Sequence, residues 1–339
     1  MQSRSLPATT SASNPSPDGR RVSRAIHPGQ QRPNRPRFHR LLEVSPPSQS
    51  SLVDPSVKIA HDRVTLSHRI LSPPAFRAMA TTSPVSARQA EFQTQGYLVV
   101  RQFLTPADFA ELQQELHRYI TQVVPTLPEG DAFYHDRSRP ETLKQMSRIE
   151  NDLFFARFIQ HSAWTNLASE LLGEPATCQG TEWFNKPPAT DHPTPPHQDN
   201  YYFCLQPPQV ITMWLALDAV DAENGCLRYI PGSHREGLRP HGRTKTLGFS
   251  QGISDYSDAD RAREVAILAQ PNDLLIHHGN TIHRADPNTS TTRHRRSFAL
   301  VFRGASARRD DVAFRRYLDS SSAQQESLGV KNAAVAMQR

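Results

Sequence analysis

The sequence is poor in cysteine and lacks any long apolar run. Its three cysteines form no Cys-x-x-Cys pair, which argues against a disulfide framework or a zinc knuckle and favours a reducing compartment. No segment approaches the roughly eighteen apolar residues that a membrane-spanning helix needs. We therefore expect a cytoplasmic protein that has no membrane partner.

The chain also lacks a basic surface in the part expected to fold. Its net charge of +6 comes from residues 1–78, which hold 12 of the 39 Lys and Arg but only 4 of the 33 Asp and Glu. The remaining 27 basic and 29 acidic residues give a net charge of −2. A nucleic-acid groove needs clustered positive charge. We expect no nucleic-acid partner, and the sequence leaves the oligomeric state open.

Residues 1–78 are rich in Ser, Pro and Arg and have no hydrophobic periodicity. Such a composition cannot bury enough apolar surface to form a core. Three interpretations compete: a disordered tail, a transit peptide that would direct the protein to mitochondria, or translated upstream sequence ahead of a second start at Met79. We predict an ordered domain over residues 89–306 and a C-terminal tail over 307–339.

The first half of that domain has helical patterns. Gly96–Val100 predicts a short strand, and Thr105 is an N-cap that opens a helix through about Val123. A second helix is predicted over Asp152–Leu172, ending at Gly173.

The second half has the pattern of strands. Gln209–Leu217 alternates, with Ile211, Met213, Leu215 and Leu217 on one face and Thr212 and Trp214 on the other. Asn224-Gly225 is a hairpin turn signal before the strand Cys226–Ile230. Further strands are predicted over Glu264–Ala269, Asp273–His278 and Ser297–Phe302. Helices followed by a run of strands favour a β-sandwich or jelly roll with helices packed outside.

The pair His197 and Asp199 is the first candidate metal motif. In an extended segment, residues i and i+2 project to the same face, so both side chains can reach one ion. With 15 histidines in the chain, one such pair is expected by chance. Alone, the pair is more typical of a solvated loop.

A third ligand lies further along the chain. The predicted strand Asp273–His278 leads to His283, which can complete a face of two histidines and one carboxylate. That face leaves adjacent positions open for a bidentate keto acid and O₂. His277 and His278 are rivals for this role, although their place in a strand favours core packing or support of the ligands.

An arginine run follows the candidate metal motif. Arg293, Arg295 and Arg296 precede the apolar strand that begins near Ser297. A guanidinium group forms a bidentate pair with a carboxylate better than a lysine does. The run is therefore a candidate site for the far carboxylate of a keto acid, and a solvated strand edge is the alternative.

The sequence resembles the phytanoyl-CoA dioxygenase (PhyH-like) family of Fe(II)/2-oxoglutarate-dependent oxygenases from about Phe92 to Gly304. The resemblance depends on the segments 96–100, 197–200, 223–234, 283–288 and 295–297. Asn224-Gly225 and Pro231-Gly232-Ser233-His234, which lie between the two iron motifs, make the match specific.

The resemblance implies a double-stranded β-helix, a cupin-like jelly roll that is mainly β with flanking helices. It places iron on the catalytic residues His197, Asp199 and His283, and the 2-oxoglutarate tail on Arg295. Lys186 and Trp214 match positions that lie near the co-substrate in relatives. The implied reaction is a hydroxylation of an unactivated C–H of a small organic substrate, using Fe(II), 2-oxoglutarate and O₂, with ascorbate as a helper, and releasing succinate and CO₂.

The chain also departs from the family pattern. Arg284-Ala285 follows the distal histidine where relatives often have Gly-Ser, and the gap to Arg295 is about one residue longer, so Arg293 and Arg296 remain alternatives. Asp199 favours a hydroxylase, because similar halogenases have a small residue there.

Two other functions remain open: a cupin-like metal enzyme that does not use 2-oxoglutarate, and a non-catalytic β-sandwich binding protein. The substrate is not indicated. Tyr201–Phe203 can line a pocket or pack as a strand, and Pro240–Tyr256 is a candidate lid. A basic cluster of Arg228, Arg239, His241 and Arg243 can receive an anion or form a solvated face.

Overall fold

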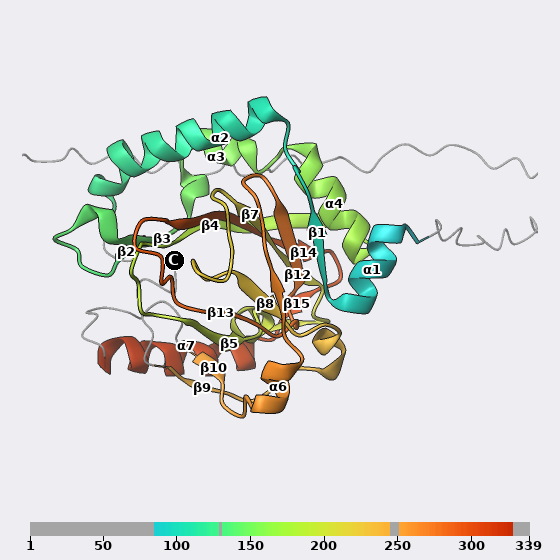
Figure 1. The fold of residues 1–339 in the computed structure, drawn as a ribbon. Helices are drawn as coiled ribbons and strands as arrows, with labels where there is room; N and C mark the ends of the chain where they lie inside the picture. Colours follow the sequence, from blue (N-terminus) through green and yellow to red (C-terminus); the bar gives the residue numbers. More distant parts are fainter. Residues whose placement is uncertain (1–84, 129–130, 245–250, 328–339) are drawn as a thin grey trace, which may run out of the picture. The chain divides into compact units, whose positions relative to one another are not determined.

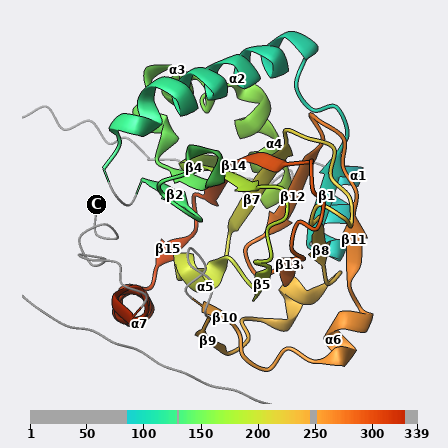
Figure 2. The ribbon, with the colours of Figure 1, turned by 60° about the vertical axis from the view of Figure 1, so that its left-hand side comes forward.

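Two antiparallel sheets form the centre of the computed structural model, which describes residues 85–128, 131–244 and 251–327 (Figures 1 and 2). The larger sheet has the strand order β1-β12-β7-β14-β4-β3-β2, and the smaller has the order β11-β8-β13-β5. The strands of the larger sheet are β1 (Tyr97–Val100), β12 (Leu274–His278), β7 (Val210–Ala216), β14 (Arg295–Gly304), β4 (Ala176–Lys186), β3 (Leu143–Ser147) and β2 (Ala132–Tyr134). Those of the smaller sheet are β11 (Val265–Ile267), β8 (Leu227–Tyr229), β13 (His283–Ala285) and β5 (Thr194–His197).

Two short pairs complete the β-structure of the described residues. They are β9 (His241–Arg243) with β10 (Gln251–Ile253), and β6 (Leu205–Gln206) with β15 (Arg308–Arg309).

Strand β7 shows how the sequence pattern divides the interior. Ile211, Met213 and Leu215 belong to the main hydrophobic core, whereas Trp214 belongs to a second cluster. Because successive side chains on a strand point to opposite faces, one face of the large sheet packs on helices and the other faces the small sheet. The predicted alternation is confirmed.

Helices cover the outer face of the large sheet. They are α1 (Ala87–Gln95), α2 (Pro106–Arg118), α3 (Leu153–Phe158) and α4 (Ser162–Leu172), and Figure 1 shows α2 and α3 lying across it. Thr105 caps α2 by accepting a hydrogen bond from the Asp108 amide, as predicted, and a π-helical turn continues the chain to Val123. Leu112, Phe155 and Trp164 are fully buried in the core between helices and sheet.

The second cluster lies between the sheets. It joins Trp214 and Leu275 of the large sheet to Tyr229 and Ala285 of the small one. Two facing antiparallel sheets with external helices are the predicted jelly roll, and the fold class is confirmed.

Some local predictions were wrong. The helix expected over Asp152–Leu172 is two helices, because His161 has extended backbone angles and caps α4 by accepting from the Ala163 amide. Residues 200–203 form the short helix α5 (Asn200–Phe203) rather than a strand. The other helices are α6 (Asp258–Ala262) and α7 (Asp311–Ser327), and α7 lies within the segment predicted as a C-terminal tail.

Residues 1–78 lie outside the described residues, so their three interpretations stay predictions. Among the described helices, none combines the length and apolar character that crossing a bilayer demands.

Candidate metal centre

Two histidines are brought together by strand pairing. His197 ends β5 and His283 begins β13, and these two residues are direct partners in the antiparallel register. Their rings lie 4.1 Å apart between centroids. Asp199 follows β5, and its Oδ1 lies 3.4 Å from His197 Nε2 and 3.6 Å from His283 Nε2. The structure thus gathers the three predicted ligand atoms within 4.8 Å of one another.

Backbone carbonyl groups fix the orientation of both histidine rings on the side away from the site. Nδ1 of His197 lies 2.7 Å from the Pro195 carbonyl oxygen, and Nδ1 of His283 lies 3.0 Å from that of Thr281. Since a carbonyl only accepts, each Nδ1 carries the proton and donates it. Each Nε2 therefore directs a lone pair into the site, the arrangement typical of metal-binding histidine.

The carboxylate of Asp199 is held by its other oxygen. Oδ2 accepts a 2.6 Å hydrogen bond from Thr212 Oγ1 and lies 3.0 Å from His277 Nε2. On its far side, Nδ1 of His277 lies 2.9 Å from the hydroxyl of Tyr229. With Oδ2 occupied, only Oδ1 faces the imidazoles, which favours a monodentate ligand. His277 supports Asp199, whereas His278 packs beside Phe92 and His234.

The electrostatics suit a cation. Burial opposes ionisation of Asp199, but the surrounding imidazoles of His283, His197 and His277 lower its pKa well below the ordinary value. Burial lowers the pKa of His283 well below 6.5. A neutral imidazole and an ionised carboxylate are the forms that ligate a divalent metal.

Arg295 lies buried at the start of β14, with 4% of its surface exposed. Its Nε has no hydrogen-bond partner, and its guanidinium carbon lies 5.5 Å from the centroid of the Trp214 ring. Ser297 lies two residues further along the same face of β14, and its buried hydroxyl also has no hydrogen-bond partner. Burial lowers the pKa of Arg295 to about 10. Two unsatisfied polar groups side by side indicate that this end of the site receives a polar ligand.

Lys186 is the register partner of Arg295 on β4. It is 6% exposed, and its Nζ donates a 2.9 Å hydrogen bond to the His192 carbonyl. Burial, together with the charge of Arg295, lowers its pKa well below the ordinary value. The three residues predicted near the co-substrate, Arg295, Lys186 and Trp214, therefore share one region of the barrel.

The rival arginines lie elsewhere. Arg293 pairs with Asp221 and Glu223, and Arg296 pairs with Asp218 at 2.6 Å. Both are much more exposed than Arg295, so the extra residue in the loop does not displace Arg295 from the interior.

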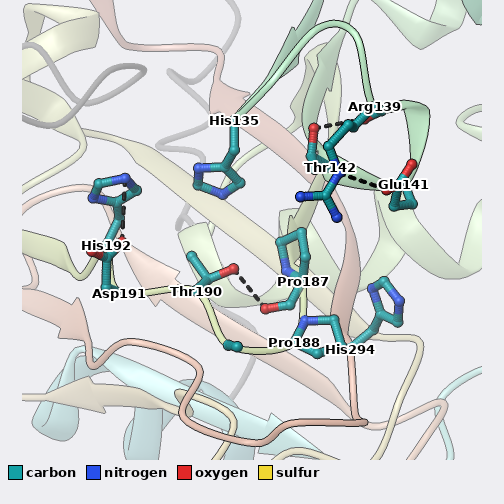
Figure 3. Close-up of a pocket in the computed structure, with 11 residues that line it drawn as sticks. His135, Arg139, Glu141, Thr142, Pro187, Pro188, Thr190, Asp191, His192 and His294 are labelled. Carbon is teal, nitrogen blue, oxygen red and sulfur yellow. Dashed lines mark hydrogen bonds and ion pairs between the residues drawn. The ribbon is translucent and has the colours of Figure 1, made fainter.

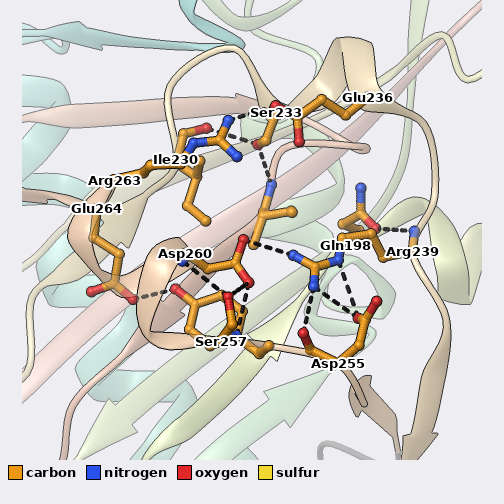
Figure 4. Close-up of polar contacts among 12 residues, drawn as sticks. Gln198, Ile230, Ser233, Glu236, Arg239, Asp255, Ser257, Asp260, Arg263 and Glu264 are labelled. Atoms are coloured by element: carbon orange, nitrogen blue, oxygen red, sulfur yellow. Dashed lines mark hydrogen bonds and ion pairs between the residues drawn. The ribbon is translucent and has the colours of Figure 1, made fainter.

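Two arginines of the predicted basic cluster are already paired with carboxylates. Arg239 binds Asp255 and Asp260, as Figure 4 shows, and Arg228 binds Asp286. Figure 4 also shows the fully buried side chain of Gln198, which accepts from the Arg239 amide and ties this loop to the metal motif. Arginines already paired with carboxylates offer little to a ligand.

Tyr201, Tyr202 and Tyr317 form an aromatic cluster next to His197. Tyr202 contacts its ring with 5.8 Å between centroids, and Tyr317 of α7 contacts both Tyr202 and Tyr201. Tyr202 donates to the Gln251 carbonyl of β10, and the Gln251 side chain donates to Ser320 of α7. Residues 245–250 of the predicted lid lie outside the described residues, so the lid stays a prediction.

A separate cavity of about 430 Å³ lies beside residues 187–192, the loop that follows β4. Figure 3 shows the residues around it; they include His135, Thr142, Pro187, Thr190, His192 and His294. None of the three candidate metal ligands lines this cavity.

The sequence interpretation missed Thr212 and Ser297 as site residues. Thr212 lies on the inward face of β7 and binds Asp199, and Ser297 follows Arg295 by two residues on β14. Their positions on alternating strands carried the signal, because a polar residue on an inward face needs a partner.

Comparisons with known proteins agree with this geometry. The family model described as phytanoyl-CoA dioxygenase (PhyH) matches residues 92–297. A probable alpha-ketoglutarate-dependent hypophosphite dioxygenase of Stutzerimonas stutzeri is 25% identical over 221 residues, covering 63% of this chain and 76% of that protein. The peroxisomal phytanoyl-CoA dioxygenase of Homo sapiens is 25% identical over 265 residues, covering 73% and 77%.

A solved structure shares the fold. The crystal structure of EvdO2 from Micromonospora carbonacea var. aurantiaca, complexed with 2-oxoglutarate, has a TM-score of 0.52 at 24% identity and covers 64% of this chain and 90% of that one.

Proposed function

Because this chain belongs to the phytanoyl-CoA dioxygenase family, we propose that His197, Asp199 and His283 hold Fe(II) and that Arg295 binds the far carboxylate of 2-oxoglutarate. The reaction class follows from the family and its relatives: the chain is a 2-oxoglutarate-dependent dioxygenase. The observation that carries the site assignment is the convergence of the three ligand atoms within 4.8 Å.

The residues present fit both groups. Two neutral imidazoles and one monodentate carboxylate form the facial set preferred by non-haem iron. The unpartnered Arg295 Nε and Ser297 hydroxyl supply donors for a carboxylate. Bound Fe(II) would supply the oxidative chemistry, in which O₂ and 2-oxoglutarate are consumed and succinate and CO₂ are released.

The protein's own contribution is position and exclusion of water. Thr212 and His277 fix Asp199 Oδ2, so that Oδ1 alone turns to the metal. The buried ring of Trp214 lies beneath the Arg295 guanidinium and shields it from solvent. We propose that this arrangement hydroxylates an unactivated C–H of a small organic substrate, with O₂ as the second co-substrate and ascorbate keeping the iron reduced.

The test separates binding from turnover. Calorimetry without oxygen should show one Fe(II) site and Fe(II)-dependent binding of 2-oxoglutarate, and admitting O₂ should give slow succinate formation even without substrate. Asp199→Ala should abolish all three, and Asp221→Ala, a surface carboxylate change, should leave them intact. Normal metal binding by the Asp199 variant would contradict the assignment.

A further inference from the structure

Glu182 is a half-buried carboxyl that the proposed reaction does not use. It lies on β4 between Trp183, which packs in the main core, and Thr181. Because side chains alternate along a strand, Glu182 shares the inward face with Phe184, which packs in the cluster between the sheets, and with Lys186.

The register places Glu182 close to the metal centre. Its partner on β14 is Ala299, and the partner of Ala299 on β7 is Trp214. Thr212, which binds Asp199, is the next inward residue on β7 after Trp214. The charge of Asp199 is itself felt at Glu182. Along this row of register partners, Ala299 is the one residue between Glu182 and Trp214.

No positive group in the described part of the chain forms an ion pair with Glu182. Its hydrogen-bonding neighbours are Gln145 and Ser147 of β3, and the charges that reach it come from Asp199 and Glu150. Burial, followed by these two carboxylates, raises its pKa to about 7. A partly desolvated carboxyl with negative groups around it favours a ligand that brings the complementary charge.

The opposite end of the same interior is positive. Arg295 and Lys186 lie there as register partners, which suits the dianionic co-substrate. The interior thus has an anion-binding end and a carboxyl-bearing side.

We propose that Glu182 binds an ammonium group of the substrate, so that the enzyme acts on an amine-bearing molecule and not on an anionic one. This inference rests on the proposed function and adds the substrate class to it. An ammonium donates up to three hydrogen bonds, so it can bind the carboxylate while Gln145 and Ser147 keep their contacts. The anionic substrates named for the relatives would be repelled by the same carboxyl.

The experiment uses three probes of equal length: n-hexylammonium, 1-hexanol and hexanoate. Each is titrated calorimetrically, at pH 8 and without oxygen, into the full chain loaded with Fe(II) and 2-oxoglutarate. The wild-type protein should bind hexylammonium at least tenfold more tightly than either of the other two. Glu182→Gln should reduce that preference to less than twofold, and Glu182→Lys should reverse it in favour of hexanoate.

Glu150→Gln is the matched control. The Glu150 carboxylate accepts from the Thr181 amide at 3.1 Å, so the variant removes a neighbouring charge and should leave the preference unchanged. Thermal unfolding and Fe(II) titration of each variant verify the fold. Wild-type protein that binds hexylammonium no better than hexanoate, or does not bind it at all, overturns the inference, as does an unchanged preference in Glu182→Gln.

The same titrations keep the two proposals apart. Wild-type protein that fails to bind 2-oxoglutarate refutes the proposed function. Protein that binds 2-oxoglutarate normally but shows no preference for the ammonium probe refutes the role of Glu182 alone.

Discussion

Replacing Arg295 tests the co-substrate site most directly. Burial lowers the pKa of its guanidinium from the ordinary value to about 10, and each tenfold change in an acid constant corresponds to about 1.4 kcal/mol. The folded protein therefore holds this charge at a cost on the order of 3 kcal/mol. An incoming carboxylate offsets that cost, and a bidentate pair adds direction to the attraction.

We expect Arg295→Ala to weaken 2-oxoglutarate binding by roughly 100-fold or more, because removing one partner of a buried charged pair costs about 2–5 kcal/mol. Arg295→Lys keeps the charge but loses the bidentate guanidinium geometry, so its 2-oxoglutarate affinity should fall less, about tenfold. Fe(II) affinity should not change in either variant. Calorimetric titration of 2-oxoglutarate into the Fe(II)-loaded protein without oxygen measures both effects.

Arg296→Lys provides the matched control. Arg296 is the next residue, but its half-exposed side chain pairs with Asp218, and exposed pairs contribute little. Its 2-oxoglutarate affinity should stay within twofold of wild type. An Arg295→Ala protein that binds 2-oxoglutarate within threefold of wild type would refute the reasoning, and a large loss in Arg296→Lys would reassign the site.

Three further predictions follow from the centre and its surroundings. Thr212→Val should weaken Fe(II) binding about tenfold to 100-fold by freeing Asp199 Oδ2. The control Thr190→Val, which loses a hydroxyl bonded to the Pro187 carbonyl, should leave Fe(II) binding unchanged. Equal Fe(II) affinities of the two variants in a metal titration would refute the role of Thr212. Burial lowers the pKa of His241 and His278 to about 4 and that of His283 well below 6.5. Below pH 6.5 the unfolded chain therefore takes up protons that the metal-free folded chain excludes. The free energy of unfolding, measured with urea, should fall by roughly 1–4 kcal/mol per pH unit toward pH 5. A free energy of unfolding that does not change over this pH range contradicts the prediction. Tyr317→Ala should speed hydrogen exchange at residues 200–203 without changing Fe(II) affinity, whereas unchanged exchange would show that α7 does not support α5.

Much of the fold was predictable because its strands alternate clearly. The alternation of Ile211, Met213 and Leu215 predicted one face of β7, which packs in the main core. Asn224-Gly225 marked the turn before β8, but the hairpin predicted there was wrong, because β7 and β8 lie in different sheets. Breaks in helices were harder, since the capping role of His161 depends on a local hydrogen bond that periodicity does not contain. The C-terminal helix α7 was missed because its contacts, such as Tyr317 with Tyr202, are distant in the sequence.

The candidate site was likewise only partly predictable from the sequence. His197, Asp199 and His283 were identified by spacing and by the family resemblance, and the structure brings them together. The family resemblance favoured Arg295 but left Arg293 and Arg296 as alternatives, because a single extra residue in a loop decides which side chain points inward. Only the pairing of β14 with β4 and β7 placed Arg295 in the interior.

The position of α7 has a practical consequence for engineering. Residues 311–327 follow the last strand of the barrel and hold none of the three candidate iron ligands, yet Tyr317 packs on both tyrosines of α5. We expect a chimera that exchanges residues 311–327 to alter the surroundings of His197 through α5 and to leave the three candidate iron ligands in place. Libraries confined to this short segment would show whether α7 influences substrate range.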